Sequence, residues 1–502
     1  MSAALPQHQL SIPSRPQQRH ERRGTRRFHE SIPLAPLIIE RAPQISPLHT
    51  HPILDFPRLL SSATLELDHH TLPSLFKACR DRGAAEEGQQ LHSQAVKRGF
   101  VSHVLVQRSL LRMYARFLDC RNALKVFERC PQPDVVSCND LIVGFCRIGD
   151  LVAARKIFDT MPDRNVVSWS VMVDGYARNG HLEIAQELFD NMPEKNHFAW
   201  NSLISGYLRF GRVEVARKIF DSTRTQWSVV TWTAMISGYV QNSQHKEALD
   251  LFLDMQVAGV MPNKVTVVSV LPAVTDLGAL SKGRSIHAYL DKTGIEVDSK
   301  LGSALIDMYS NCGCIEDAVS VFMKIKQREL SAWNSIISGL AAHGRARYAI
   351  HLFHKMRDEY KIIPNDITFT AILSACRHAG LVEEGRRMFH LFTDYYKLKP
   401  NIRHYGCMVD LFARAGCLKE AVDFVDAMPV KPNSIIWKSL ISACRIHKDV
   451  ELVGWVCKKI IESGPRDSGS YILISNILND VGQHEDAGKV RKQMNDLQGE
   501  LS

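Results

Sequence analysis

A unit of 31 to 36 residues repeats along most of this chain, and this repetition constrains the fold more than any other feature. Residues 166–179 read VVSWSVMVDGYARN, residues 197–210 read HFAWNSLISGYLRF, and residues 229–242 read VVTWTAMISGYVQN. Five of the seven tryptophans occupy the fourth position of a unit: Trp169, Trp200, Trp232, Trp333 and Trp437. Recurrence at a fixed spacing is typical of a protein that stacks copies of one supersecondary unit.

The second half of each unit repeats as well. Residues 181–196 read HLEIAQELFDNMPEKN and resemble residues 151–165, LVAARKIFDTMPDRN. Apolar residues recur at helical spacing in these segments. A Met-Pro pair then ends several units, and a polar residue with glycine, such as Asn179-Gly180, divides the unit in the middle. Each unit therefore predicts two helices joined by a turn.

A single helical hairpin cannot bury its own apolar face, so neighbouring hairpins must stack into an all-α solenoid of tandem helix-turn-helix repeats. We interpret the fourth-position tryptophans as packing residues between helices rather than as platforms for nucleobases. The eleven predicted units are 69–103, 104–134, 135–165, 166–196, 197–228, 229–263, 264–298, 299–329, 330–365, 366–401 and 402–433. Two further hairpins with a more divergent sequence are expected at 434–467 and 468–502.

Composition narrows the class of protein without identifying a partner. The 502 residues are 45% hydrophobic and 23% charged, as in folded proteins. The net charge of +9 suits a polyanionic partner but also suits many proteins that bind none. No apolar stretch approaches the ~18 residues that a membrane helix needs, so we expect no membrane span. The 12 cysteines include no Cys-x-x-Cys pair, which argues against a zinc finger.

The first 68 residues differ from the rest of the chain. Residues 1–30 hold six arginines against two glutamates, together with serines and prolines. Such a segment is typical of an organelle transit peptide. We predict a transit peptide and disordered segment over 1–68, with a mitochondrial destination favoured over the chloroplast. A basic tail without a targeting role is the alternative.

The motif VVSWSVMVDGYARNGHLEIAQELFDNMP resembles the pentatricopeptide repeat (PPR) family, whose repeats bind RNA. A tetratricopeptide repeat would instead carry Trp-x2-Leu-Gly-x2-Tyr in its first helix. Shorter and longer units alternate as in the plant PLS subclass, and residues 434–478 resemble the E-type extension of that subclass. The resemblance implies a right-handed superhelical solenoid with P-, L- and S-type repeats over 69–433, followed by an E-type helical extension over 434–502.

In this family the fifth and the last residue of each repeat contact one base of single-stranded RNA, with repeats running 5′ to 3′. An Asn amide can donate and accept a hydrogen bond, whereas an Asp only accepts. Carried over to this chain, the base-reading pairs are Asn139/Asn165, Ser170/Asn196, Asn201/Ser228, Thr233/Asn263 and Asn334/Asn365. The second residues that would flank the bases are Val136, Val167, Phe198, Val230 and Val265.

These pairs imply pyrimidine, adenine, cytosine, adenine and pyrimidine, or 5′-Y-A-C-A-n-n-Y-3′. Thr370/Asn401 would add an adenine but lies in a long-type unit. The pairs that match no base are Pro73/His103, Arg108/Asp134, Val268/Asp298, Ser303/Glu329 and Gly406/Asn433. For any single Asn or Ser near a helix start, a helix N-cap is the ordinary alternative.

PLS proteins with E-type extensions are mostly site-recognition factors for C-to-U editing of organelle transcripts. A zinc deaminase needs His-x-Glu followed by Pro-Cys-x-x-Cys. His181-Leu182-Glu183 and His245-Lys246-Glu247 match only the first half of that motif. We therefore expect no enzyme activity, no catalytic or metal-binding residues and no cofactor.

The expected partners of such a monomer are a DYW-type deaminase recruited in trans through residues 434–502 and multiple organellar RNA editing factors. Two other functions stay open from the sequence. One is an RNA splicing, stabilisation or translation factor, and the other is a protein-binding helical scaffold. A helical enzyme is a remote third, since no catalytic constellation is apparent.

Overall fold

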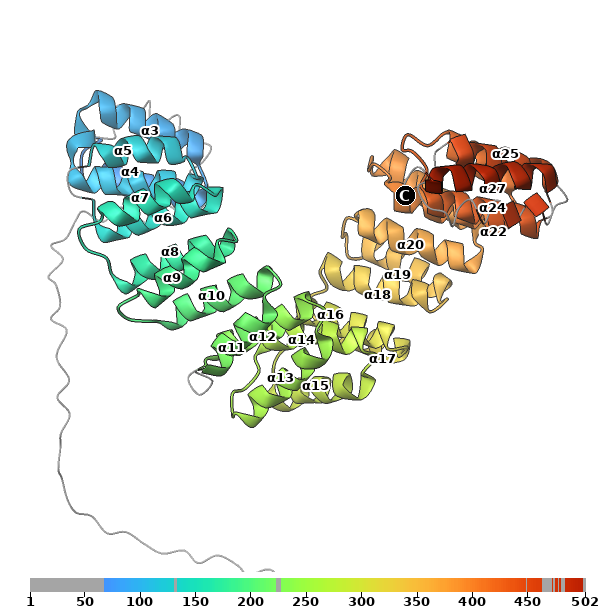
Figure 1. Ribbon diagram of the computed structural model, residues 1–502, viewed down its shortest axis with the longest axis horizontal. Coiled ribbons are helices and arrows are strands. Elements are labelled where there is room, and N and C mark those ends of the chain that lie inside the picture. Colours follow the sequence, from blue (N-terminus) through green and yellow to red (C-terminus); the bar gives the residue numbers. More distant parts are fainter. Residues whose placement is uncertain are drawn as a thin grey trace, which may run out of the picture. The chain divides into compact units, whose positions relative to one another are not determined.

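The repeated units form helical hairpins that follow one another in chain order (Figure 1). The computed structural model describes residues 67–499 except 131–132, 223–226, 448, 463–471, 473–474, 477 and 480–483. The segment 1–66, where a transit peptide is expected, therefore lies outside the described residues. Helices and no strands are found in the described part of the chain. None of the described helices is both long and apolar enough to cross a membrane.

The first helix of each unit is called its A helix and the second its B helix. The A helices are α2 (Thr71–Arg82), α4 (Val104–Phe117), α6 (Val135–Ile148), α8 (Val166–Arg178), α10 (His197–Arg209), α12 (Val229–Gln241), α14 (Lys264–Asp276), α16 (Ser299–Asn311), α18 (Leu330–Ala342), α20 (Asp366–Ala379), α22 (Ile402–Arg414) and α24 (Ser434–Ile446). The B helices are α3 (Ala85–Lys97), α5 (Cys120–Glu128), α7 (Leu151–Thr160), α9 (Leu182–Asp190), α11 (Val213–Ser222), α13 (His245–Val257), α15 (Leu280–Thr293), α17 (Ile315–Lys324), α19 (Ala346–Asp358), α21 (Val382–His390), α23 (Leu418–Asp426) and α25 (Val450–Glu462). The remaining elements are the short helices η1 (Phe100–Ser102) and η3 (Leu391–Tyr395) and the helix α27 (His484–Gly499).

Each A helix packs against its own B helix and against the A helices of the neighbouring units. The A helices therefore form a continuous row, and the B helices cover one side of it. An uninterrupted apolar core extends from Ile204 in α10 to Val490 in α27. This stacking confirms the predicted all-α solenoid.

The B helices account for the unequal lengths of the units. The B helices α5, α7 and α9 span 9 to 10 residues, whereas α13, α15 and α19 span 13 to 14 residues. The A helices vary less, from 12 to 14 residues. The A helices, which contact one another from unit to unit, thus keep an almost constant length while the outer helices differ.

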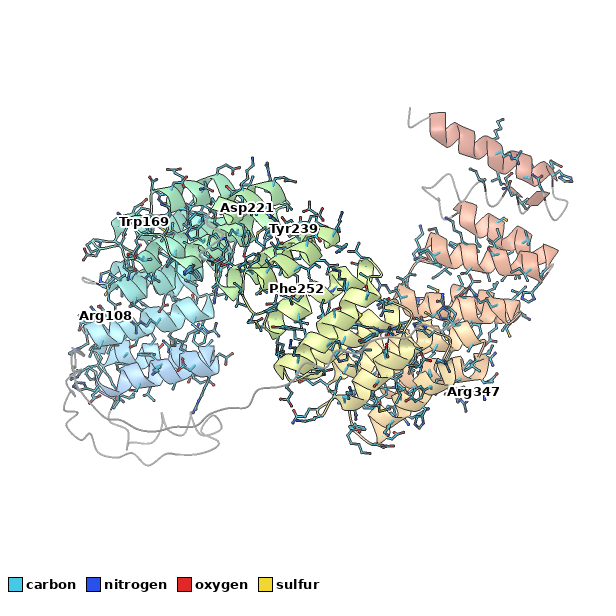
Figure 2. All side chains as sticks on the ribbon, turned by 90° about the horizontal axis from the view of Figure 1, so that it is seen from below. Arg108, Trp169, Asp221, Tyr239, Phe252 and Arg347 are labelled. Atoms are coloured by element: carbon cyan, nitrogen blue, oxygen red, sulfur yellow. The ribbon has the colours of Figure 1, made fainter. Side chains whose placement is uncertain are left out.

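The fourth-position tryptophans fill the joints between units, as the packing interpretation expects. Trp169 makes an edge contact with Phe158 of the preceding B helix at 5.0 Å between ring centroids, and Figure 2 labels it within the stack. The equivalent contacts are Phe189–Trp200 at 4.4 Å, Phe220–Trp232 at 4.9 Å and Phe322–Trp333 at 4.8 Å. Edge contacts of this kind stabilise beyond the area that they bury.

Glycines on the A helices allow neighbouring A helices to approach closely. A Cβ atom added at Gly206 would lie 2.7 Å from the Cβ of Ala177 and 3.3 Å from its Cα and carbonyl oxygen. A Cβ atom at Gly238 would lie 2.3 Å from Leu208. Because the atoms near Gly206 belong to a backbone and its first side-chain carbon, they cannot rotate away. The tenth position of these units is therefore restricted to glycine by packing.

We predict that Gly206→Ala destabilises the protein by about 1–2 kcal/mol, because overpacking outweighs the gain in helix propensity. Gly406→Ala is the matched control, since its added Cβ would meet only Ile436 at an ordinary 3.7 Å. The control should raise stability by about 0.5–1 kcal/mol. Urea denaturation of both variants measures the two changes, and an equal effect of both would contradict the packing argument.

Two histidines link long units to the A helix of the next unit. His92 of α3 lies 2.7 Å from the hydroxyl of Tyr114, and His287 of α15 lies 2.9 Å from that of Tyr309. Burial lowers the pKa of both His92 and His287 below the ordinary value of 6.5. The folded protein therefore holds both imidazoles neutral at a pH where the unfolded chain binds protons.

It follows that stability falls as pH falls through about 6.5, because the unfolded state then binds more protons than the native state. The double variant His92→Gln/His287→Gln should lose less stability than the wild type between about pH 7.5 and pH 5.5. Thermal melts at several pH values measure the difference. The other histidines are the same in both proteins, so equal losses would show that these two do not contribute.

Candidate nucleic-acid interface

The last residue of a unit is the N-cap of the next A helix. The side-chain oxygen accepts a hydrogen bond from the backbone N–H three residues later, which would otherwise lack a partner. The N–H of Ala199 donates to Oδ1 of Asn196 at 2.8 Å, and the N–H of Thr368 donates to Oδ1 of Asn365 at 3.1 Å. The same bond caps the helices after Asn165, Asn263 and Asn433, at 3.0 Å each. Ser228 makes no such side-chain bond.

The capping bond uses one hydrogen-bonding group of each side chain and so determines which group remains for a ligand. Because a backbone N–H can only donate, Oδ1 of a capping Asn must accept, and its Nδ2 becomes the remaining group. None of the hydrogen bonds that the structure describes involves Nδ2 of Asn165, Asn196 or Asn263. The last Asn therefore accepts within the cap, and the N–H groups of Nδ2 are the ones without a described partner for a ligand.

An Asp at the same position carries a second acceptor oxygen in place of the Asn donor. Asp134 caps α6 and Asp298 caps α16 through Oδ1, at 3.1 and 3.0 Å. The second oxygen of each carboxylate then accepts from a basic side chain, Arg112 at 3.3 Å for Asp134 and Lys264 for Asp298. Asn and Asp thus support the same cap and present opposite hydrogen-bonding groups.

The structure brings three of the five predicted pairs together. The hydroxyl of Ser170 lies 3.1 Å from Oδ1 of Asn196, and Nδ2 of Asn334 donates to Oδ1 of Asn365 at 3.2 Å. Thr233 reaches Asn263 through a third residue. Its hydroxyl lies 2.7 Å from that of Thr266, which donates to Oδ1 of Asn263 at 3.1 Å.

The other two pairs, Asn139/Asn165 and Asn201/Ser228, share no hydrogen bond among the described residues. Oδ1 of Asn139 and Oδ1 of Asn201 are buried without a hydrogen-bond partner in this part of the chain. Asn139 is 7% exposed. A buried acceptor without a donor costs about 1–3 kcal/mol. A ligand that supplies an N–H or O–H group to either oxygen would remove this cost, which would favour its binding.

Apolar side chains stand exposed beside these pairs. The predicted flanking residues Val136, Val167, Phe198, Val230 and Val265 are 50% to 62% exposed. The sequence analysis missed three residues at the same repeat position, Leu105, Ile367 and Ile435, which are 53% to 69% exposed. These single apolar residues lie on α4, α6, α8, α10, α12, α14, α20 and α24 and offer apolar faces at regular intervals within each run of helices. Such faces suit planar bases.

A second row that the sequence analysis missed carries positive charge. Four consecutive A helices have an exposed arginine near their C-terminal ends: Arg116, Arg147, Arg178 and Arg209. Arg147 follows Val136 by eleven residues, which is close to three full helical turns, so the two rows share one helix face. The recurring strings YAR, FCR, YAR and YLR were the available signal.

In the units whose pairs match no base, the fifth and last residues form other contacts or lack a side chain. Arg108, at the fifth position, lies 3.8 Å from the carboxylate of Asp134 (Figure 2 labels Arg108). Ser303 donates its hydroxyl to the carbonyl oxygen of Ser299 at 2.7 Å, as Ser170 does to that of Val166 at 2.6 Å, but its unit ends in Glu329, which makes no side-chain cap. Gly406 has no side chain to contribute. These units offer no free pair comparable to Ser170/Asn196.

No catalytic or metal-binding constellation emerges from the described residues. They contain no group of three His, Cys, Asp or Glu side chains that could hold a metal ion. The half-motif residue His245 pairs with Asp276 at 3.2 Å. Burial raises the pKa of Cys376 and of Cys444 to about 12, so both thiols stay protonated and serve as packing groups.

Comparison with known proteins relates both the repeats and the C-terminal region to described families. The family model "PPR repeat" matches residues 136–166, 167–197, 198–224, 303–330, 367–394 and 403–431. The model "PPR repeat family" matches residues 228–274 and 330–378, and the model "E motif" matches residues 447–498.

A solved structure shares the fold. The crystal structure of the pentatricopeptide repeat protein PPR10 in complex with an 18-nt psaJ RNA element matches with a TM-score of 0.55 and 16% identity. The match covers 88% of this chain and 76% of that one. PPR10 is from maize.

Sequence relatives from Arabidopsis thaliana differ in how much of their length the chain spans. A chloroplastic pentatricopeptide repeat-containing protein is 42% identical over 270 residues, which is 53% of this chain and 36% of that protein. Another relative is 40% identical over 54% of this chain and 45% of its own length, so the chain spans less than half of these two. A mitochondrial one is 34% identical over 436 residues, 85% of this chain and 78% of that protein. With repeats matched along its length and a relative shared over most of both chains, the chain belongs to the pentatricopeptide repeat family.

Proposed function

We propose that this protein binds single-stranded RNA one base per repeat and acts as a site-recognition factor for C-to-U editing of organelle transcripts. One observation carries the RNA-binding part. Side chains that cap successive A helices hold their free donor or acceptor groups in fixed orientations beside a row of exposed apolar residues. Regularly spaced polar groups between apolar faces match the edges and faces of unstacked bases.

The orientation of the caps suggests how bases are told apart. A capping Asn offers N–H donors, which match the acceptor N1 of adenine and the acceptor N3 of cytosine. A capping Asp offers an acceptor, which matches the N–H groups of guanine and uracil. A short Ser170 or Thr233 leaves room for a purine, while a longer Asn139 or Asn334 reaches a smaller pyrimidine. The proposed string stays 5′-Y-A-C-A-n-n-Y-3′, read by residues 135–263 and 330–365.

Charge supports an RNA partner over a protein partner. The arginine row of α4, α6, α8 and α10 lies on the same helix face as the apolar row and would neutralise phosphates. Affinity should then fall steeply as salt rises. A protein-binding scaffold needs the caps as well, but it has no need to keep Asn, Ser or Thr at the fifth position of successive units.

The editing role rests on the C-terminal region. The match of residues 447–498 to the E motif agrees with an extension that recruits other proteins. The chain itself is not an enzyme in this proposal, and it needs no cofactor. A DYW-type deaminase supplied in trans and multiple organellar RNA editing factors are the proposed partners. Relatives named mitochondrial and chloroplastic support an organelle, and the arginine-rich N-terminus favours the mitochondrion.

Asn196→Asp tests the reading of bases directly. Asp134 and Asp298 show that an Asp supports the same cap, so the fold should tolerate the change. The donor that faces the base becomes an acceptor. We expect preference at that base to move from adenine to guanine, by about tenfold or more for one charge-assisted contact. Binding to RNA pools with this position randomised measures the shift, and unchanged preference would exclude Ser170/Asn196 as readers.

Organelle transcriptome sequencing in a plant that lacks the protein tests the editing role. We expect one or a few sites to lose C-to-U conversion, with a match to 5′-Y-A-C-A-n-n-Y-3′ shortly upstream. Complementation with a chain that lacks residues 463–502 should restore RNA binding but not editing, because α24 still covers α22 and α25 still packs against α24. Intact editing with altered splicing or abundance of a transcript would instead identify a factor for those processes.

A further inference from the structure

A chain of hydrogen bonds crosses the junction between units 330–365 and 366–401. It joins the fifth residue of the first unit, Asn334, to its last residue, Asn365, and to Thr368, the third residue of the next unit. The hydroxyl of Thr368 donates to Oδ1 of Asn334 at 2.7 Å and lies 3.0 Å from Oδ1 of Asn365. Thr368 is fully buried and Asn334 is 9% exposed. A buried, paired network of this kind specifies one arrangement of its groups.

The direction of every bond in this chain follows from a single backbone group. The N–H of Thr368 can only donate, so the Asn365 atom that it meets at 3.1 Å must be the amide oxygen. The Asn334 atom that faces this oxygen at 3.2 Å must then be Nδ2. The other end of the Asn334 amide, its Oδ1, consequently points to the Thr368 hydroxyl and receives its proton.

In this arrangement the groups without a described partner, and so available to a base, are N–H groups. The oxygens of Asn334 and Asn365 are both occupied within the protein, and each amide keeps at least one N–H without a described partner. Cytosine presents acceptors at N3 and O2, whereas uracil presents an N–H donor at N3. Uracil accepts only at O2 and O4, on either side of this N–H, so a pair whose free groups are donors matches N3 of cytosine and opposes N3–H of uracil.

We propose that Thr368 is a positioning residue for base selection, which makes Asn334/Asn365 prefer cytosine over uracil. This inference rests on the proposed RNA binding and narrows the pyrimidine assigned to that repeat. Without the hydroxyl, Oδ1 of Asn334 would lose its donor. Only the 3.2 Å bond from Nδ2 to Asn365 would then hold the amide, so it could turn by breaking that one bond and offer its oxygen to the N3–H of uracil.

The same contact recurs at the other junctions where the third residue completes a reciprocal cap. Thr266 accepts from the N–H of Asn263 at 3.3 Å and contacts the fifth residue Thr233 at 2.7 Å. His404 accepts from the N–H of Asn401 at 3.0 Å and contacts the fifth residue Thr370 at 2.9 Å. In the described residues, each of these reciprocal caps thus also touches the fifth residue of the preceding unit.

Thr231 provides a matched control at the same repeat position. It is fully buried like Thr368, but its hydroxyl has no hydrogen-bond partner among the described residues. Thr368→Val and Thr231→Val remove the same atom from equally buried sites. Only the first removal breaks contacts with a fifth and a last residue.

The test selects bound sequences from a randomised single-stranded RNA pool with the full chain as wild type, Thr368→Val and Thr231→Val. We expect the wild type to favour cytosine over uracil at the base of repeat 330–365. Thr368→Val should lower this ratio by about three- to tenfold, the effect of one net hydrogen bond. Thr231→Val should leave it unchanged, as should both variants at the bases of the other repeats.

Each other outcome has a distinct meaning. A wild type without any sequence preference would refute the proposed RNA reading itself. A wild type that prefers other bases normally, with the cytosine-to-uracil ratio unaffected by Thr368→Val, would overturn only the role of Thr368. If Thr368→Val does not fold, Thr368→Ser and Thr368→Ala replace it, since they leave similar space and only serine keeps the hydroxyl. The serine variant should then retain the ratio and the alanine variant lose it.

Discussion

The hydrogen bond from a backbone N–H to the last side chain of the preceding unit is the interaction on which the rest of the structure depends. Every A helix starts with amide groups that the helix itself cannot satisfy. At α8, α10 and α20 the chain supplies Asn165, Asn196 and Asn365 for this purpose. The same bond starts the helix, links two units and orients the amide. A structural requirement thereby determines which group each unit presents to a ligand.

Packing between A helices keeps these caps in register. Gly206 lets α10 approach α8 so closely that even a methyl group would collide with Ala177. Trp200 fills the space beside it against Phe189. The glycine limits how far apart neighbouring A helices lie, while the tryptophan joins an A helix to the B helix of the preceding unit. The outer B helices can vary in length because they do not set this spacing.

Much of this architecture could be predicted from the sequence, because helix signals and repeat spacing are local. The predicted units from residue 104 onward begin where the A helices begin. The first unit is the exception. It is predicted to begin at residue 69, whereas its A helix begins at Thr71, whose N–H donates to Asp68 at 2.7 Å. The orientation of the amides could not be predicted, since it depends on contacts between units. The proposed role of Thr368 could not be predicted either, because its hydroxyl contacts Asn334, a residue 34 positions earlier.

Sharing one side chain between stability and recognition limits the residues that can occupy the last position. The best caps are Asn, Asp, Ser and Thr, and their replacement by Ala costs about 0.5–2 kcal/mol per helix. Within that set, Asn and Asp differ little as caps but differ completely in what they offer outward. Specificity can therefore change at one repeat without a loss of stability, as Asn196 and Asp298 illustrate with equivalent caps. The fifth position of unit 330–365 does not have this freedom, because the amide of Asn334 is held by both Asn365 and Thr368.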